Sequence, residues 1–230
     1  MPVNRFFLDQ PLSSPLFLQG EELHHLHVMR TRLGDTIEIV NGRGELGKAF
    51  VEAIDKKTAS LKIESLVKKK PPTQKLILAQ ALPRLSSLEW VIEKGTELGV
   101  SEFWLFPGKL SEKTSLSPTQ LQRLRTITIS ALKQCGRLFL PLIVLRPVLN
   151  QWKKLEGSLF YGDVGEKAPL TGPFLNLVTF LIGPEKGLDL SEIQTLNTLG
   201  AKPISLHENI LRSETAAVTA LSQFFVLRGV

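Results

Sequence analysis

Residues 175–200, LNLVTFLIGPEKGLDLSEIQTLNTLG, join an apolar run, a glycine-rich turn and an amphipathic segment without interruption. The run LNLVTFLIG is almost continuously apolar, which is typical of a strand buried on both faces of a parallel sheet. The segment LDLSEIQTLNTLG has apolar residues at helical spacing and ends in a glycine, so it predicts a helix. A buried strand followed directly by a helix is the repeating unit of an α/β fold.

The same alternation continues through the rest of the chain after residue 75. Apolar runs that predict strands are LILAQAL (76–82), SEFWLF (101–106), PLIVL (141–145), SLFYGD (158–163) and KPISL (202–206). Helical patterns are SSLEWVIEKGTEL (86–98), SPTQLQRLRTITISALKQCGR (117–137) and TAAVTALSQFFVL (215–227), with a short helix around Trp152. Ser117 and Pro118 suit the cap and the first position of the long helix. The pattern predicts a parallel sheet covered by helices on both faces.

The first 70 residues have a different pattern, dominated by short alternating segments. Predicted strands are RFFL (5–8), PLFL (15–18), DTIEIV (35–40), KAFVEAI (48–54) and SLKIESL (60–66), with one helix at 21–30. This pattern predicts a small β-barrel that carries one helix. The stretch VKKKPPTQK (67–75) contains two prolines among lysines, so we place a domain boundary there, giving domains 1–70 and 71–230. The alternative is a charged surface loop within one domain.

Composition limits the class of protein and its partners. The 230 residues are 43% hydrophobic and 22% charged, as in an ordinary globular protein, and the net charge of +6 favours a polyanionic partner. A single cysteine, Cys135, excludes an intrachain disulfide and a cysteine-based zinc site. The first residues lack a signal-peptide pattern, and no apolar run is long enough to span a membrane, so we expect a cytoplasmic protein.

Small and polar residues follow three of the predicted strands, in YGDVGEK (161–167), IGPEKG (182–187) and LHENILRSE (206–214). Ligands of parallel sheets bind at the carboxyl ends of strands, so these stretches predict a binding site. IGPEKG lacks both the Walker ending and the G-x-G-x-x-G pattern, and a tight strand-to-helix turn is the alternative for it. Arg212, Ser213 and Glu214 lie at the start of the last helix, where capping explains Ser213 and Glu214 but not Arg212.

Four long segments resemble successive motifs of the RsmE-type ribosomal RNA methyltransferases, which belong to the SPOUT class. They are ALPRLSSLEWVIEKGTELGVSEFWLF (81–106), ALKQCGRLFLP (131–141), LIGPEKGLDLSEI (181–193) and LHENILRSETAAVTAL (206–221), and NRFF (4–7) and HHLHVMRTRLGD (24–35) resemble the family's N-terminal motifs. The resemblance implies a PUA-like β-barrel that helps to hold RNA, followed by an α/β domain with a SPOUT-type parallel sheet. It also implies a deep trefoil knot with S-adenosylmethionine bound in it, and a homodimer formed through the knotted domain.

The resemblance further implies methylation of N3 of a uridine in 16S ribosomal RNA of the small ribosomal subunit. The cofactor would be held by two turns and their neighbours: Tyr161, Gly183, Pro184, Glu185, Gly187, Leu206, Asn209, Ile210, Leu211 and Ser213. Arg212, with Arg5 as a second candidate, would stabilise the charge on the uracil oxygens after N3 loses its proton. Glu214 or Glu185 could accept that proton, although the helix dipole is an alternative explanation for Glu214.

Two departures from the family pattern accompany this resemblance. Lys186 stands where the family's Gly-Pro-Glu-Gly-Gly turn has a glycine, and His207-Glu208 replaces a more usual Gly-Pro. The departure at Lys186 leaves open a catalytically silent RNA-binding protein. A further alternative is a SPOUT methyltransferase acting on another RNA.

Contacts to RNA are predicted for Arg5, His25, Arg30, Arg32 and Arg84, since basic residues bind phosphates. An ordinary solvated surface is the alternative for the arginines. The spacing of His24 and His27 suits a metal, but no third ligand is evident nearby, so we predict no metal site. Trp90 and Trp104 lie in apolar patterns and are interpreted as core residues.

Overall fold

The computed structural model describes residues 4–13 and 15–228. The chain divides into two compact units. The first unit extends to Pro71 and includes Ile129–Leu140, and the second consists of Pro72–Thr128 and the residues from Pro141 onward. The C-terminal half of the long helix therefore belongs to the first unit, although its sequence lies within the range predicted for the second domain.

The first unit contains a five-stranded sheet in the order β1-β3-β4-β5-β2. Its strands are β1 (Arg5–Phe7), β2 (Leu16–Leu18), β3 (Thr36–Val40), β4 (Glu45–Ile54) and β5 (Ala59–Lys68), and its own helix is α1 (Gly20–Val28). β1 is parallel to β3, and the other pairs are antiparallel. The core lies between α1 and alternate residues of the strands, among them Phe6, Leu26 and Ile39. The predicted strands are confirmed, but β4 and β5 are ten residues long rather than short.

The second unit contains a six-stranded sheet in the order β11-β9-β10-β6-β7-β8, and all its strands are parallel. The strands are β6 (Lys75–Ala81), β7 (Glu102–Phe106), β8 (Leu142–Leu145), β9 (Ser158–Gly162), β10 (Leu177–Ile182) and β11 (Lys202–Ile204). Each falls within or beside an apolar run of the sequence, so the predicted parallel sheet is confirmed. Near-continuous apolar runs form these strands because helices cover the sheet on both sides.

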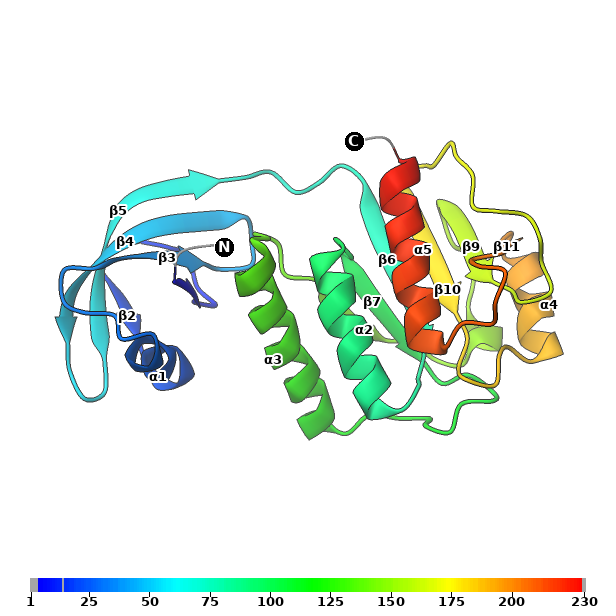
Figure 1. Cartoon of the computed structure of the whole chain (residues 1–230), viewed down its shortest axis with the longest axis horizontal. Coiled ribbons are helices and arrows are strands. Elements are labelled where there is room, and N and C mark those ends of the chain that lie inside the picture. The colour runs from blue at the N-terminus through cyan, green and yellow to red at the C-terminus, as the bar shows by residue number, and fades with distance from the viewer. Residues whose placement is uncertain (1–3, 14, 229–230) are drawn as a thin grey trace. The chain divides into compact units, whose positions relative to one another are not determined.

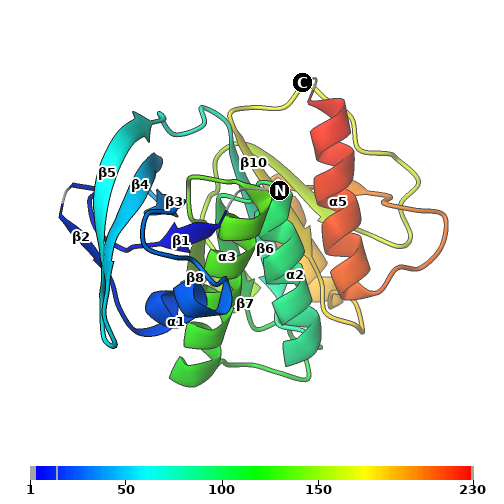
Figure 2. The ribbon, with the colours of Figure 1, turned by 60° about the vertical axis from the view of Figure 1, so that its left-hand side comes forward.

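Helices cover the two faces of this sheet. α2 (Leu85–Glu97), the first part of α3 (Pro118–Cys135) and α5 (Ser213–Leu227) pack on one face, around residues such as Leu78 and Phe180. α4 (Leu190–Thr198) and the short helix η1 (Leu149–Gln151) pack on the other face. Figure 1 and Figure 2 both show α2 and α5 side by side on their face of the sheet.

Polar side chains fix where the helices begin. Ser117 and Gln120 exchange hydrogen bonds with each other's backbone N–H at the start of α3, and Asp189 and Glu192 do the same at α4. α5 begins after Arg212 without a side-chain cap. In the part of the chain that the structure describes, no helix is long and apolar enough to cross a membrane.

The strand order determines where a site can form. β9, β10 and β11 are neighbours in the sheet, so the three segments that follow their carboxyl ends come together at one edge. These are the stretches beginning near Gly162, Gly183 and Ser205, which lie far apart in the sequence.

Candidate active site

A pocket lies at the carboxyl edge of the sheet, where these segments meet. Its lining consists of Gly162, Asp163, Val164, Ile182, Gly183, Pro184, Glu185, Gly187, Leu188, Leu206, His207, Glu208, Asn209, Ile210, Leu211, Ser213 and Ala216. All the residues predicted to hold a cofactor are among them except Tyr161. Two short segments form most of the walls, and we name them the glycine turn (residues 183–188) and the exposed turn (residues 206–211).

The glycine turn brings the backbone close to the pocket. A Cβ atom on Gly183 would lie 3.1 Å from Leu188 Cγ, and one on Gly162 would lie 3.1 Å from Leu206 Cδ1, so side chains there would crowd the walls. Gly187 has a φ of +79°, which favours glycine. Lys186 is not among the described residues with positive φ, so the lysine at this position fits the turn without strain.

A buried relay of hydrogen bonds joins the start of the glycine turn to α5. Ser213 Oγ donates to the carbonyl oxygen of Gly183 at 2.6 Å. Gln80 Nε2 donates to Ser213 Oγ at 2.9 Å and to the carbonyl oxygen of Ala81 at 3.0 Å. Gln80 is fully buried at the end of β6, and Ser213 is also buried. Ser213 therefore connects the glycine turn to the start of α5, and its hydroxyl hydrogen is already committed to Gly183.

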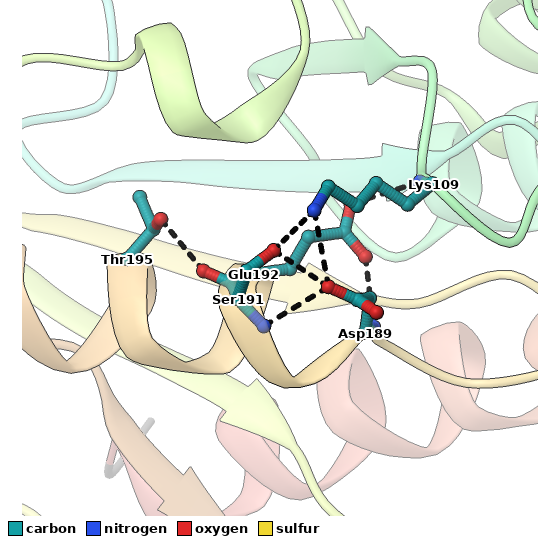
Figure 3. A network of polar contacts seen from close by, with 5 residues as sticks. All are labelled: Lys109, Asp189, Ser191, Glu192 and Thr195. Atoms are coloured by element: carbon teal, nitrogen blue, oxygen red, sulfur yellow. Dashed lines mark hydrogen bonds and ion pairs between the residues drawn. The ribbon is translucent and has the colours of Figure 1, made fainter.

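The far end of the glycine turn is fixed by a second network, shown in Figure 3. The buried carboxylate of Glu192 accepts from the backbone N–H of Lys109 at 3.0 Å and from that of Asp189 at 2.9 Å. Lys109 Nζ forms an ion pair with Asp189 Oδ1 at 3.2 Å. Hydrogen bonds from the hydroxyl and backbone of Ser191, with a contribution from Lys109, lower the pKa of Asp189. The loop after β7 is thereby tied to the start of α4.

Two further contacts hold the middle of the glycine turn. Gly108, in the loop after β7, packs so closely that a Cβ there would lie 3.4 Å from Pro184 Cδ. Glu185 Oε1 accepts from the backbone N–H of Arg84, ahead of α2, at 3.1 Å. The turn is thus braced by segments that follow β6 and β7.

The exposed turn has fewer polar contacts to its surroundings. Gln223 of α5 donates to the carbonyl oxygen of Leu206 at 2.9 Å, and within the turn the N–H of Asn209 donates to His207 Nδ1 at 3.0 Å. Ile210 is 79% exposed beside the pocket, although it is apolar. This wall offers apolar side chains and backbone groups to a ligand.

The two predicted catalytic residues adjoin the exposed turn. Arg212 lies between the lining residues Leu211 and Ser213, is exposed, and forms no ion pair within the described residues. Glu214 is half-buried in the first turn of α5 and does not line the pocket. The exposed guanidinium of Arg212 thus belongs to a residue flanked on both sides in the chain by residues of the pocket lining.

The charge in the pocket is opposite in sign to that of the whole protein. Among the described residues that line it, the charged side chains are acidic: Asp163, Glu185 and Glu208. The chain as a whole has a net charge of +6. A pocket with this lining suits a ligand that carries positive charge together with apolar and hydrogen-bonding groups.

The structure places Tyr161 away from the pocket, contrary to its predicted cofactor contact. Tyr161 is buried in the core under α4, and its hydroxyl donates to Asn197 Oδ1 at 3.2 Å. Burial also raises the pKa of this phenol. Successive strand residues face opposite sides of a sheet, and the pocket takes its contacts from the residues after Tyr161.

The residues predicted to contact RNA fall into two groups. Arg5 is only 8% exposed and is held by Glu38 Oε2, at 2.9 Å from Nε and 2.6 Å from Nη2, so it forms an internal ion pair rather than a surface contact. His25 packs against Phe6 at 5.1 Å between ring centroids. Burial, helped by Lys133, lowers the pKa of His25, which disfavours the charged form. Both residues therefore have structural roles in the first unit.

Arg30, Arg32 and Arg84 are exposed, as a contact to RNA requires. Arg84 Nε reaches Glu112 at 3.4 Å, which is a loose ion pair at the surface. Within residues 4–13 and 15–228, no cluster of histidine, cysteine or acidic residues could hold a metal ion.

A parallel sheet with a ligand pocket at its carboxyl edge defines the second unit as a ligand-binding α/β domain. The model of the RNA methyltransferase domain family matches residues 69–224, and that of the RNA methyltransferase PUA domain matches residues 18–64. The chain therefore belongs to the RNA methyltransferase domain family, with a PUA domain before the methyltransferase unit.

The similarity to known proteins covers nearly the whole length of the chain. Two relatives named ribosomal RNA small subunit methyltransferase E are that of Synechocystis, 31% identical over 95% of this chain and 75% of its own, and that of Rickettsia conorii, 28% identical over 99% and 97%. A Legionella pneumophila structure in complex with the bound cofactor SAM has a TM-score of 0.87 at 27% identity, covering 98% of both chains. The Neisseria gonorrhoeae methyltransferase E has the same fold, with a TM-score of 0.85 at 24% identity over 98% of both chains.

Proposed function

We propose that this protein transfers a methyl group from S-adenosylmethionine to N3 of a uridine in 16S ribosomal RNA of the small ribosomal subunit. The observation that carries this proposal is the pocket formed by the glycine turn and the exposed turn, in a chain of the RNA methyltransferase domain family. The names of the relatives support ribosomal RNA of the small subunit as the substrate, and the SAM-bound Legionella structure supports the cofactor.

The residues of the pocket fit this cofactor. The glycines allow close approach of its adenosine part to the backbone, and Leu206 and Leu211 offer apolar walls. The acidic lining favours its net positive charge. When bound, S-adenosylmethionine supplies an electrophilic methyl group carried on a positively charged sulfur.

The remaining chemistry falls to side chains next to the pocket lining in the chain. N3 of neutral uridine carries a proton, and the nitrogen becomes nucleophilic only when that proton leaves. The negative charge then spreads over the two neighbouring carbonyl oxygens, where the free guanidinium of Arg212 can stabilise it. Glu214, half-buried on the next turn, is our candidate to accept the proton. The target base has to leave its stack to reach the pocket.

We extend the proposal to a cytoplasmic homodimer formed through the methyltransferase unit. Support comes from apolar side chains left exposed at the end of α5, of which Val226 is 77% exposed beside Phe225 and Leu227. Exposed apolar groups of this kind favour association with another surface. The trefoil knot expected from the resemblance remains a prediction.

The catalytically silent alternative rested on Lys186 in the glycine turn. Its backbone conformation is an ordinary one and the turn is braced on both sides, so this departure gives no reason for loss of the cofactor. Methylation of another RNA is the alternative that an assay of the product decides.

The test is methylation of small ribosomal subunits that lack the modification, using labelled S-adenosylmethionine and digestion of the RNA to nucleosides. We expect label in 3-methyluridine with the wild-type protein. Label in another nucleoside would retain the methyltransferase but exclude the uridine assignment. If no label appears and the cofactor also fails to bind, the protein binds RNA without catalysing methylation.

A further inference from the structure

Arg146 lies at the same edge of the sheet as the pocket, but at the opposite end of the strand order. It directly follows β8, and its backbone N–H donates to the carbonyl oxygen of Leu105 at 2.8 Å, which continues the pairing past the end of the strand. Three strand spacings separate β8 from β10, or about 14 Å. Arg146 is therefore outside the pocket but at the same carboxyl edge of the sheet.

Two tryptophans hold the guanidinium of Arg146 in place. Its Cζ atom lies 4.7 Å from the ring centroid of Trp104 and 4.8 Å from that of Trp152. Each ring is fixed in turn by a hydrogen bond at 2.9 Å, from Trp104 Nε1 to Glu102 and from Trp152 Nε1 to the carbonyl oxygen of Pro147. Stacking on aromatic rings leaves the in-plane donors of a guanidinium available for another partner.

No acidic group neutralises this guanidinium within the described residues. Arg146 forms no ion pair or side-chain hydrogen bond there, and its buried Nε has no acceptor. Its two terminal nitrogens are not among the buried unpaired atoms, so they keep contact with solvent in a residue that is partly buried. The carboxylate of Glu102, on the strand next to β8, accepts a hydrogen bond from Trp104. Lys153 and Lys154, both exposed, follow Trp152 and add positive charge.

We propose that Arg146 binds a backbone phosphate of the RNA substrate. A guanidinium held rigidly and left without an anion matches the paired oxygens of a phosphate, and it loses little conformational freedom on binding. Arg146 lies at the carboxyl edge of the sheet, outside the pocket. This position suits a phosphate of the RNA a few nucleotides away from the methylated one. This proposal rests on the methyltransferase activity proposed above, and it assigns to Arg146 a positioning role for RNA with no part in the chemistry.

The experiment measures methyl transfer to small ribosomal subunits at KCl concentrations of about 50 to 200 mM, where phosphate contacts have a strong effect. Arg146→Gln removes the charge and is expected to raise the KM for RNA about tenfold, with kcat and the Kd of S-adenosylmethionine unchanged. The slope of log KM against log salt should fall by about 1, the signature of one lost phosphate contact. Arg146→Lys should retain most of the slope.

Lys75→Gln is the matched control, because Lys75 is an exposed basic residue at the amino end of β6, on the opposite edge of the same sheet. It removes the same charge and should leave both KM and the salt slope unchanged. The proposal is overturned if Arg146→Gln lowers Tm but keeps the wild-type salt slope, since Arg146 then serves only to pack the tryptophans. It is also overturned if Lys75→Gln reduces the slope equally. A wild-type protein that methylates no RNA would instead overturn the proposed function.

Discussion

The glycine turn and the exposed turn line the same pocket but are held in different ways. The glycine turn is joined to Ser213 at its start, to Arg84 in its middle and to Lys109 through Glu192 at its end. The exposed turn is joined to α5 through Leu206 and carries the apolar side chain of Ile210 in solvent. One wall is thus arranged before a ligand arrives, whereas the other has freedom to adjust to it.

This difference divides the expected effects of substitutions. Groups that brace the glycine turn are buried and hydrogen-bonded, so their loss should weaken both the fold and the binding of the cofactor. The exposed group directly after the exposed turn, that of Arg212, contacts solvent, so its loss should change activity and leave stability nearly unaffected.

The largest effect is expected for Arg212→Ala, directly after the exposed turn. Loss of the guanidinium should lower kcat by about 100- to 1,000-fold, because the charge on the uracil oxygens loses its stabilising partner. Tm and the Kd of S-adenosylmethionine should stay near the wild-type values, since Arg212 is exposed and unpaired within the described residues. Single-turnover methylation, calorimetric binding and thermal unfolding measure the three quantities.

Arg212→Lys is the informative companion, because it keeps a positive charge without the planar fork. Its rate should lie between those of the wild type and the alanine variant. If Arg212→Ala methylates at the normal rate, the guanidinium has no part in the reaction and the catalytic assignment is wrong.

The next effect concerns Gln80, which braces the glycine turn through Ser213. Gln80→Leu removes the hydrogen bonds to Ser213 and Ala81 from a fully buried site, and it also removes the buried Oε1, which has no partner among the described residues. The two lost hydrogen bonds outweigh the removal of this unpaired atom, so the free energy of unfolding should fall by about 1 kcal/mol. The Kd of S-adenosylmethionine should rise about tenfold, while kcat at saturating cofactor remains close to normal. Isothermal titration and urea unfolding test the two effects.

Thr179→Val provides the matched control for Gln80. Thr179, on the neighbouring strand β10, is 1% exposed, and its hydroxyl has no hydrogen-bond partner among the residues that the structure describes. Its replacement should leave the Kd unchanged and should not destabilise the fold. Equal losses of cofactor affinity in both variants would show that general loosening of the sheet, and not the relay to Gly183, governs binding.

The strands and helices could be predicted because their periodicity is a local property of the sequence. The run LNLVTFLIG became β10, and LDLSEIQTLNTLG contains α4. The stretches that line the pocket were also within reach, since ligands of parallel sheets bind where strands end. Gln80 was missed, although a lone polar residue in the apolar run LILAQAL is a signal that could have found it.

Other features depend on relations that the sequence does not reveal. Tyr161 was placed at the pocket because the phase of a strand that is apolar on both faces cannot be read from its residues. The bond between Glu192 and the backbone of Lys109 joins segments that only the strand order brings together. The interpretation of Trp90 as a core residue was wrong: α2 buries Leu88 and Val91, and Trp90 falls between them with 40% of its surface exposed.

A smaller effect is expected for Glu192→Gln, at the far end of the glycine turn. The carboxylate accepts from two backbone N–H groups, and an amide can accept from only one of them without presenting its own donors to the other. The free energy of unfolding should fall by about 1–2 kcal/mol and the Kd of S-adenosylmethionine should rise about threefold. Thr198→Ala, on the exposed side of α4, is the control and should leave both nearly unchanged. A larger loss of affinity than in Gln80→Leu would reverse the ranking of the two braces.

The smallest effect concerns His25, which belongs to neither turn and therefore tests whether the pocket responds to stability alone. Burial against Phe6 lowers the pKa of His25 below 6.5, the ordinary value that it regains on unfolding. Between these two values the unfolded chain binds more protons, so stability should decrease as the pH falls below about 6.5, with no contribution above it. Urea unfolding gives the free energy of unfolding at each pH. Above about pH 6.5 this free energy should change with pH in the same way in the wild type and in His25→Gln, and below it the free energy of the wild type should fall more steeply. The Kd of S-adenosylmethionine should be the same in both proteins at every pH.

A pH-dependent difference in Kd would mean that loss of stability outside the two turns also weakens binding of the cofactor. The contrast between the braced wall and the exposed wall would then not explain which substitutions affect binding.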